Sequence, residues 1–502
     1  MDCFKLDCRA IRATRVLLYS LVILDCLIRI WDVGALYCDD GVYSRLTAMK
    51  KFPHSEFINV WMLAGSRVFG YAMFLVTIAA AAAGIWGRSH QRLIGWFLWF
   101  VVTGLQCRVP FACDGGDGFM RVALVWLAWL PYDRNGSARS GASAAYMIQL
   151  VLIYVFSFWH KSGASWMDGS ALKVTLQAEH ISSSFGLWLS QFDLLCQALT
   201  FGTLLLEGSI VALVLLPIAN EKWLMWIRLV VPGTMILFHL GIAATMNIHL
   251  FPWIAMACWV ALFPSSLWDW IEQRLNRELG HLDVIAVDWK VSLAAVGCLS
   301  VVVAWNAAAH SKRVGDLHPA LTWFARSTRL SQQWHFFSPR PYNGSDRERL
   351  VAYTSDGRWI DIYPRRGYRF EKTVRKQLKK KDRGRFFLRK FVSWHEQKTG
   401  DEIAYAVLET GFKKTGSGQD YRWRRRAWIG SAPRRIVDER PVAKALNSLV
   451  DLGRDWFDPE FVYLETLPDL RGPIVERHLA FHRIGVPYEQ EKMTDRDEIG
   501  LY

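Results

Sequence analysis

The stretch AAYMIQLVLIYVFSFWHKSGASWMDG, residues 144–169, indicates the fold class of this chain. Its apolar run over residues 144–159 ends at His160 and Lys161 and is followed by a turn that contains Trp166. An apolar run that ends in a cation and an indole is typical of a membrane-spanning helix whose end lies among lipid headgroups. The stretch therefore predicts a transmembrane helix with a charged end.

Comparable apolar runs recur through the first 310 residues. Hydrophobic residues make up 52% of the chain, and its 25 tryptophans are typical of helix ends at lipid headgroups. The runs lie at residues 15–31, 69–85, 93–107, 119–131, 144–159, 194–218, 225–246, 250–264 and 291–309. We predict a mainly α, polytopic bundle of about nine transmembrane helices over residues 1–310, with the shorter runs tilted or extended by flanking residues.

The short loops predict the orientation of this bundle. Arg139, Arg228 and Lys290 belong to alternate loops that fall on the side of the basic N-terminus. Because basic short loops stay in the cytoplasm, we predict a cytoplasmic N-terminus, retained as a first helix rather than removed as a signal peptide. Nine crossings then place the C-terminal domain outside, on the side of the loops at 108–119 and 160–193. We expect a bacterial cell (inner) membrane.

Residues 311–502 predict a small, basic α+β domain outside the membrane. Strand pairs are predicted at 347–365, turning at Asp356-Gly357, and at 403–429, with helices at 367–396 and 440–456. From Lys312 onward the chain has 38 Lys and Arg and 26 Asp and Glu, so this part carries a net positive charge. The run YRWRRRAW at 421–428 resembles single-strand binders, but a strand on the membrane surface explains it equally well. We expect membrane lipids as partners and no nucleic acid.

Cysteine and histidine spacing gives little sign of a metal site. All nine cysteines precede residue 300 and none is spaced C-x-x-C, which excludes a thiolate metal site of that kind. One disulfide among Cys38, Cys107 and Cys113 is compatible with an oxidising outer face. His478 and His482 are four residues apart, but no third ligand accompanies them, so we predict no metal.

Several polar residues interrupt the apolar runs, where a charge costs roughly 2.5–3.5 kcal/mol at mid-bilayer. Asp25 and Arg29 are four residues apart and can pair on one helical face. Glu207 has no partner nearby in the sequence, which predicts either a raised pKa or a buried partner such as an arginine. His239 and Asn247 are further candidates for a site within the bundle.

The loop RVPFACDGGDGFMR, residues 108–121, places two aspartates and three glycines between apolar runs. Asp114 and Asp117 can cap the helix that follows, and capping alone would explain these residue types. A phosphate cradle is not expected, because it would need a lysine and no carboxylates. One carboxylate beyond the cap leaves room for a site.

Lys161 has two interpretations. In the first, it extends to the membrane interface beside Trp166, while Asp168 caps the next helix. In the second, it is sufficiently desolvated to lose its proton near neutral pH and act as a general base, oriented by His160 or Asp168.

Five segments together resemble a known family. They are DCRAIRATRVLLYSLVILDCLIR (7–29), LYCDDGVYSR (36–45), RVPFACDGGDGFMRVALVWLAWLPYDR (108–134), HKSGASWMDGSAL (160–172) and FHLGIAATMNIHLFPW (238–253). Their order and spacing resemble the HTTM family, whose horizontally transferred transmembrane domain is shared with vitamin K-dependent γ-carboxylases. The resemblance covers roughly residues 1–310, and QQWHFFSPRP (332–341) is similar to the segment that follows the last helix in bacterial members.

The resemblance implies a bundle whose pocket opens to the outer face. By its position in the motif, Lys161 would deprotonate a reduced quinone, with His160, Asp117 and Glu207 as further catalytic residues. We expect Trp166, Asp168, His239 and Asn247 to line the cofactor site.

The chain also departs from the carboxylase pattern. Asp117 stands where the carboxylases place a functional histidine, and the C-terminal domain is smaller and lacks cysteine, so carboxylation of glutamate is not implied. Two functions follow. One is a membrane-embedded enzyme that uses a lysine base and a quinone-like or lipidic cofactor on a peptide or small substrate at the outer face. The other is a non-catalytic maturation, export or lipid-binding factor, because other family members are similar to a sporulation-delaying toxin maturation protein.

Overall fold

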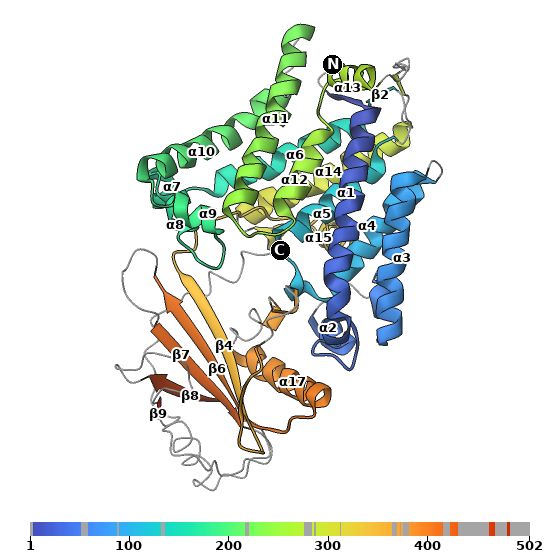
Figure 1. Cartoon of the computed structure of the whole chain (residues 1–502). Coiled ribbons are helices and arrows are strands. Elements are labelled where there is room, and N and C mark those ends of the chain that lie inside the picture. Colours follow the sequence, from blue (N-terminus) through green and yellow to red (C-terminus); the bar gives the residue numbers. More distant parts are fainter. Residues whose placement is uncertain are drawn as a thin grey trace.

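The computed structural model describes residues 4–51, 59–87, 90–131, 136–215, 220–275, 284–285, 288–311, 313–363, 369–371, 373–374, 381–414, 422–429, 461–466 and 479–481. A helical bundle occupies one part of the molecule and a sheet with one long helix occupies the other (Figure 1). Together they have one hydrophobic core that extends from the bundle into the sheet domain.

Each of the nine predicted apolar runs corresponds to a helix. These helices are α1 (Cys8–Arg29), α3 (Arg67–Trp86), α4 (Gln91–Arg108), α5 (Gly115–Trp129), α6 (Gly141–His160), α10 (Asp193–Leu215), α11 (Glu221–Thr245), α12 (Phe251–Val260) and α14 (Trp289–His310). Shorter helices are α2 (Arg45–Lys51), α7 (Ala164–Met167), α8 (Ala171–Leu176), α9 (Ser184–Leu189), α13 (Ser265–Arg274) and α15 (Pro319–Ser327). Single turns of tighter or wider helix lie at Ile30–Asp32, Val33–Tyr37, Val60–Met62, Pro110–Ala112 and Val314–Asp316.

Fewer of these helices than predicted have the length and composition of a membrane span. Among the residues that the structure describes, five do: α3, α6, α10, α11 and α14. The pair α12 and α13 would make a sixth, but it is bent by 91° at the break between Val260 and Ser265, so the two helices do not make one straight crossing. Helix α5 has 15 residues, short of the roughly 20 that a crossing needs. These apolar helices are those expected of an integral membrane protein.

A three-stranded sheet joins distant parts of the chain at one end of the bundle. Strand β1 (Lys5–Asp7) pairs antiparallel with β2 (Ser137–Arg139), which pairs parallel with β3 (Val284–Ile285). The Arg228 guanidinium also donates to the carbonyl of Lys5. The N-terminus and the basic loops, which we predicted on one side, therefore do lie together.

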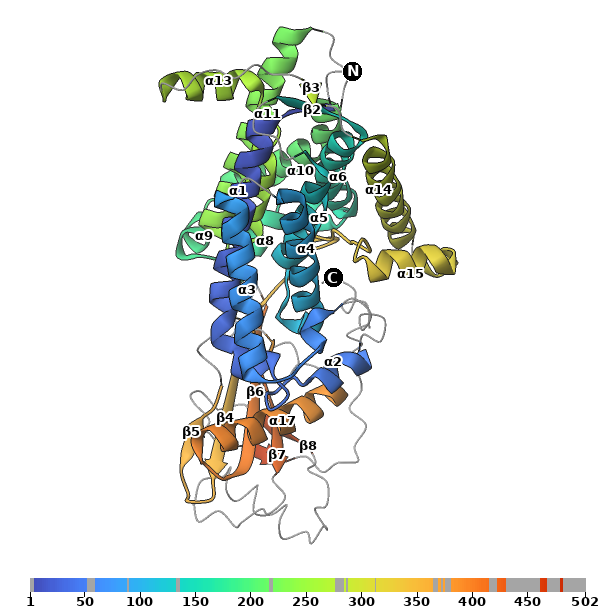
Figure 2. The same cartoon turned by 90° about the vertical axis from the view of Figure 1, so that its right-hand side faces the viewer.

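A six-stranded antiparallel sheet forms the C-terminal domain at the opposite end (Figure 2). Its strand order is β5 (Trp359–Asp361), β4 (Ser345–Thr354), β6 (Ile403–Lys413), β7 (Arg422–Ile429), β8 (Phe461–Thr466) and β9 (Leu479–Phe481), and α17 (Lys381–Thr399) packs against it. The two predicted strand pairs are confirmed as β4–β5 and β6–β7, the first turning at Gly357 with φ +90°. The predicted helix at 440–456 lies outside the described residues.

Contacts place the two predicted outer loops beside this domain. The backbone NH of Glu179 donates to Ser345 Oγ at 2.9 Å, and Arg369 donates to the carbonyl of Ala112 at 2.9 Å. The loops at 108–119 and 160–193 therefore share one side with the domain, as predicted, and the N-terminus lies at the other end of the bundle (Figures 1 and 2).

Candidate functional site

The C-terminal end of α6 forms the first polar site. Ser157 and Lys161 are four residues apart, so they lie on the same face of the chain as it leaves the helix. Lys161 Nζ lies 2.5 Å from Ser157 Oγ and 2.5 Å from Glu207 Oε2 of α10. The hydroxyl of Ser157 donates in turn to Glu207 Oε1 at 3.3 Å. Only 3% of the Lys161 side chain and 6% of the Glu207 side chain are exposed, so Lys161 does not extend to the membrane interface.

Aromatic side chains enclose this pair. The Trp166 ring lies 5.0 Å from Lys161 Nζ, close enough for a cation–π contact. Deeper in the bundle, the Tyr154 hydroxyl lies 2.8 Å from His239 Nε2 and accepts a hydrogen bond from Trp259 Nε1 at 2.8 Å. Lys161, Glu207 and Trp166 therefore meet. His239 belongs to a second buried polar group around Tyr154, which lies about one helical turn before Ser157 on α6.

The segment after α15 covers the site from the side of the C-terminal domain. Trp166 Nε1 donates to the carbonyl of Phe337 at 3.0 Å, and the backbone NH of Gly163 donates to the carbonyl of Pro339 at 3.0 Å. Sequence reasoning did not predict this cover, although QQWHFFSPRP was recognised as a motif. Its mixture of aromatic residues and prolines was the available signal.

The other predicted residues lie elsewhere. The ring of His160 packs against those of His310 and His335, with centroids 4.8 Å and 3.9 Å away. Asp168 is exposed and accepts from the backbone NH of Ser170 at 2.8 Å. Asn247 is exposed and donates to the carbonyl of Ser182 at 3.0 Å. Neither His160 nor Asp168 orients Lys161, because Ser157 and Glu207 do so.

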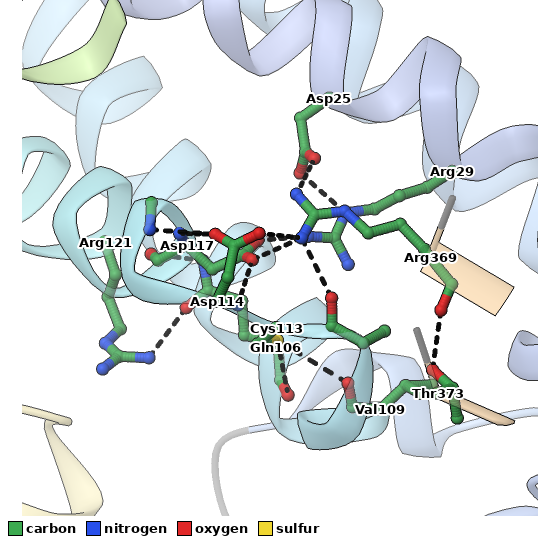
Figure 3. Close-up of polar contacts among 12 residues, drawn as sticks. Asp25, Arg29, Gln106, Val109, Cys113, Asp114, Asp117, Arg121, Arg369 and Thr373 are labelled. Carbon is green, nitrogen blue, oxygen red and sulfur yellow. Dashed lines mark hydrogen bonds and ion pairs between the residues drawn. The ribbon is translucent and has the colours of Figure 1, made fainter. Parts of the chain in front are cut away.

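The second polar site is an ion cluster between the bundle and the C-terminal domain (Figure 3). Arg29 Nε lies 2.7 Å from Asp25 Oδ2, as the four-residue spacing predicted, and the Arg29 guanidinium also pairs with Asp117. Arg369 enters from the other side, with Nη1 2.6 Å from Asp117 Oδ2 and 3.2 Å from Asp114 Oδ2, and Nη2 2.8 Å from Asp25 Oδ1.

This cluster explains the aspartate-rich loop. Asp114 accepts from the backbone NH groups of Gly116 and Asp117, and Asp117 Oδ2 accepts from the NH of Asp114 at 2.7 Å, so the predicted helix cap is a complete capping box. Asp117 is part of this cap and also binds Arg29 and Arg369, so neither aspartate is left over for a separate site. Burial and Arg29 act to lower the pKa of Arg369, but the aspartates raise it above its ordinary value.

Metal and disulfide chemistry find no support in the part of the chain that the structure describes. No group of His, Cys, Asp and Glu there could hold a metal ion. Among the described residues, Cys38, Cys107 and Cys113 form no disulfide with one another, so the bridge considered among them is not present. The histidine pair at 478 and 482 lies outside the described residues.

Comparisons with known proteins identify no family: no protein-family model, no curated protein and no solved structure matches this chain. The fold and the site define the class instead, a helical membrane protein with a buried lysine–glutamate pair under a covering segment.

Proposed function

We propose that this chain is a membrane-embedded enzyme of the HTTM, carboxylase-like class, in which Lys161 is the base. The observation that carries the proposal is the position of Lys161 Nζ, buried and held by Glu207 and Ser157. We further propose the predicted orientation, with a cytoplasmic N-terminus and the C-terminal domain outside a bacterial inner membrane.

Glu207 gives Lys161 a route to its basic form. In surroundings of low polarity an ion pair is less favoured over its neutral counterpart than it is in water, because charges lose their solvation. A proton moves from Lys161 Nζ to Glu207 Oε2 across their 2.5 Å contact, which leaves a free amine and a carboxylic acid. The amine then takes a proton from a substrate hydroxyl, which becomes an oxyanion beside the new ammonium.

The residues present fit a reduced quinone or a similar aromatic lipid. His239 Nδ1 is buried and has no hydrogen-bond partner among the described residues, and aromatic rings surround it. Trp166 and His239 would hold such a group, which supplies an acidic hydroxyl and two electrons when bound. The substrate would be a peptide or small molecule that reaches the site from the outer face.

A non-catalytic maturation, export or lipid-binding role is the second candidate. It is favoured by the covering segment, because Phe337 and Pro339 bind the turn that follows Lys161 and restrict access to it. In that case the lysine–glutamate pair would serve only to hold α6 against α10.

Replacing Lys161 by Met tests the proposal, since methionine keeps most of the side-chain volume and removes the amine. Purified wild type should carry a redox-active lipid detectable by mass spectrometry and should oxidise an added reduced quinone with dioxygen as the two-electron acceptor. K161M should lose the oxidation and remain inserted and monodisperse. The matched control is K173M, because Lys173 is a partly exposed lysine that also pairs with one carboxylate, Asp193 at 2.7 Å. Equal oxidation by K161M and wild type, or no redox lipid in any sample, would favour the non-catalytic role.

A further inference from the structure

A hollow of about 420 Å³ lies where the bundle meets the C-terminal domain. One wall is the turn after α1, with Asp39 and Asp40, and the other is the face of α17 that carries Arg389, Lys390 and Trp394. Neither wall belongs to the lysine site or to the ion cluster. The hollow therefore has an acidic side from one part of the chain and a basic side from another.

The acidic wall is fixed in place. Asp39 accepts from the backbone NH of Arg45 at 2.9 Å and from its Nε at 2.8 Å, and the buried Arg108 guanidinium lies 3.9 Å behind it. Burial acts to raise the pKa of Asp39, but the hydrogen bonds from Arg45 hold it below the ordinary aspartate value. A hydrogen bond from Cys38 and a paired arginine lower the pKa of Asp40 as well. Both carboxylates are therefore charged at neutral pH.

The basic wall is presented by a well-packed helix. Lys390 and Trp394 are four residues apart on α17 and share one face of the helix, and Arg389, one position before Lys390, lines the same hollow. The Trp394 ring packs against Phe370 with centroids 5.1 Å apart, and Phe370 and Phe391 are both buried. Trp394 therefore gives the hollow a rigid, partly apolar side between the charged walls.

Exposed apolar side chains around the acidic wall indicate the level of the membrane surface. Asp39 donates its backbone NH to the carbonyl of Gly65 at 2.9 Å, which ties it to the segment before α3. Close to that segment Leu63 is 73% exposed, Val68 is 79% exposed, and Leu46 of α2 is 69% exposed. At a bilayer edge such side chains would be covered by lipid, which would put the hollow at headgroup depth.

We propose that this hollow binds a headgroup that carries both a phosphate and a primary amine, as in phosphatidylethanolamine. The phosphate pairs with Arg389 and Lys390 and the ammonium with Asp39 and Asp40. A headgroup that is only anionic would bring its charge close to the two carboxylates and bind less well. The same chemistry exists in soluble phosphoethanolamine, so the test includes it.

The experiment measures lipid binding to the purified full chain in detergent by native mass spectrometry. Phosphatidylethanolamine and phosphatidylglycerol with the same acyl chains are titrated separately, and soluble phosphoethanolamine is titrated alone. Wild type should bind the ethanolamine lipid at least about tenfold more tightly, roughly 1.4 kcal/mol, than the glycerol lipid. R389Q/K390Q should weaken binding of both lipids about tenfold, and D40N should remove the preference between them.

The control is K290Q, which removes an exposed lysine in the first turn of α14, outside the lining of the hollow, and should leave binding unchanged. Binding of soluble phosphoethanolamine but of neither lipid would support the headgroup chemistry and assign it to a soluble ligand. The proposal would be overturned if wild type bound both lipids with equal affinity and R389Q/K390Q bound them as tightly as wild type does. Because none of these variants touches Lys161, failure here leaves the proposed enzyme activity unaffected.

Discussion

Replacing Arg369 by Met should loosen the attachment of the C-terminal domain to the bundle. Arg369 is the cation that the domain contributes to the ion cluster, where it contacts Asp25, Asp114 and Asp117. Without it, Arg29 is the remaining cation that contacts Asp25 and Asp117. At least one of the three carboxylates then keeps its negative charge in the interior without a cation paired to it.

The magnitude follows from how deeply the cluster is buried. The side chains of Arg369 and Asp117 are 3% and 2% exposed, so water screens the pair little. Removing one partner of such a pair typically costs about 3–5 kcal/mol, because the other charge stays buried. The second substitution in R369M/D117N removes one of the excess carboxylates. The double variant should therefore be more stable than the sum of the two single losses predicts.

Unfolding in detergent, followed by tryptophan fluorescence, measures this loss. Hydrogen exchange of residues 110–118 should rise in R369M as the domain separates. The matched control is R358M, since Arg358 also pairs with two aspartates, Asp356 and Asp401, but is 59% exposed. Exposed pairs contribute little, so this variant should behave like wild type. If R369M unfolds at the same midpoint as R358M and exchange does not change, the cluster does not hold the domain.

Two further perturbations probe the covering segment and the pH response. G163A should lower the free energy of unfolding by about 1–3 kcal/mol, because a Cβ there would lie 2.2 Å from the carbonyl oxygen of Pro339. The displaced segment should then be cleaved faster by protease at residues 332–341. The control is G241A, where the added Cβ would have no atom within 4 Å, so this variant should be neutral or stabilising. Burial raises the pKa of Asp32 from 3.8 to about 6, so the folded state binds more protons than the unfolded state between those values and stability falls as pH rises through them. For wild type this loss in the free energy of unfolding is about 3 kcal/mol, and D32N should abolish it. Unfolding midpoints of both proteins at about pH 4 and pH 7 measure the difference. A D32N pH profile equal to that of wild type would contradict the assignment to Asp32.

Periodicity and local spacing predicted the elements well. Every apolar run became a helix, and the two strand pairs formed, because each of these features depends on residues close in sequence. The Asp25–Arg29 pair and the cap at Asp114 are local for the same reason. The run at 250–264 formed a shorter helix than predicted, since α12 ends at Val260 and the chain then bends by 91° into α13.

The partners across the fold could not be predicted in this way. Glu207 was expected to have a buried partner such as an arginine, and it does have a buried cation, but the spacing did not identify that cation as Lys161, 46 residues away. Hydrophobic periodicity shows which face of a helix points inward and not which helix it meets. Arg369 gave no signal, because it lies in a segment with many other arginines and lysines and only the folded chain distinguishes it.

The position of Arg369 also has a consequence for biosynthesis. Asp117 is made 252 residues before its partner Arg369, which at 5–20 residues per second is a delay of roughly 13–50 seconds. During that interval the nascent bundle holds Asp25 and Asp117 paired with Arg29, without the second cation that Arg369 supplies. Ribosomal synthesis of the basic domain is thus what completes the interior of the bundle, so a chain interrupted before residue 369 should be recognised as incomplete by membrane proteases.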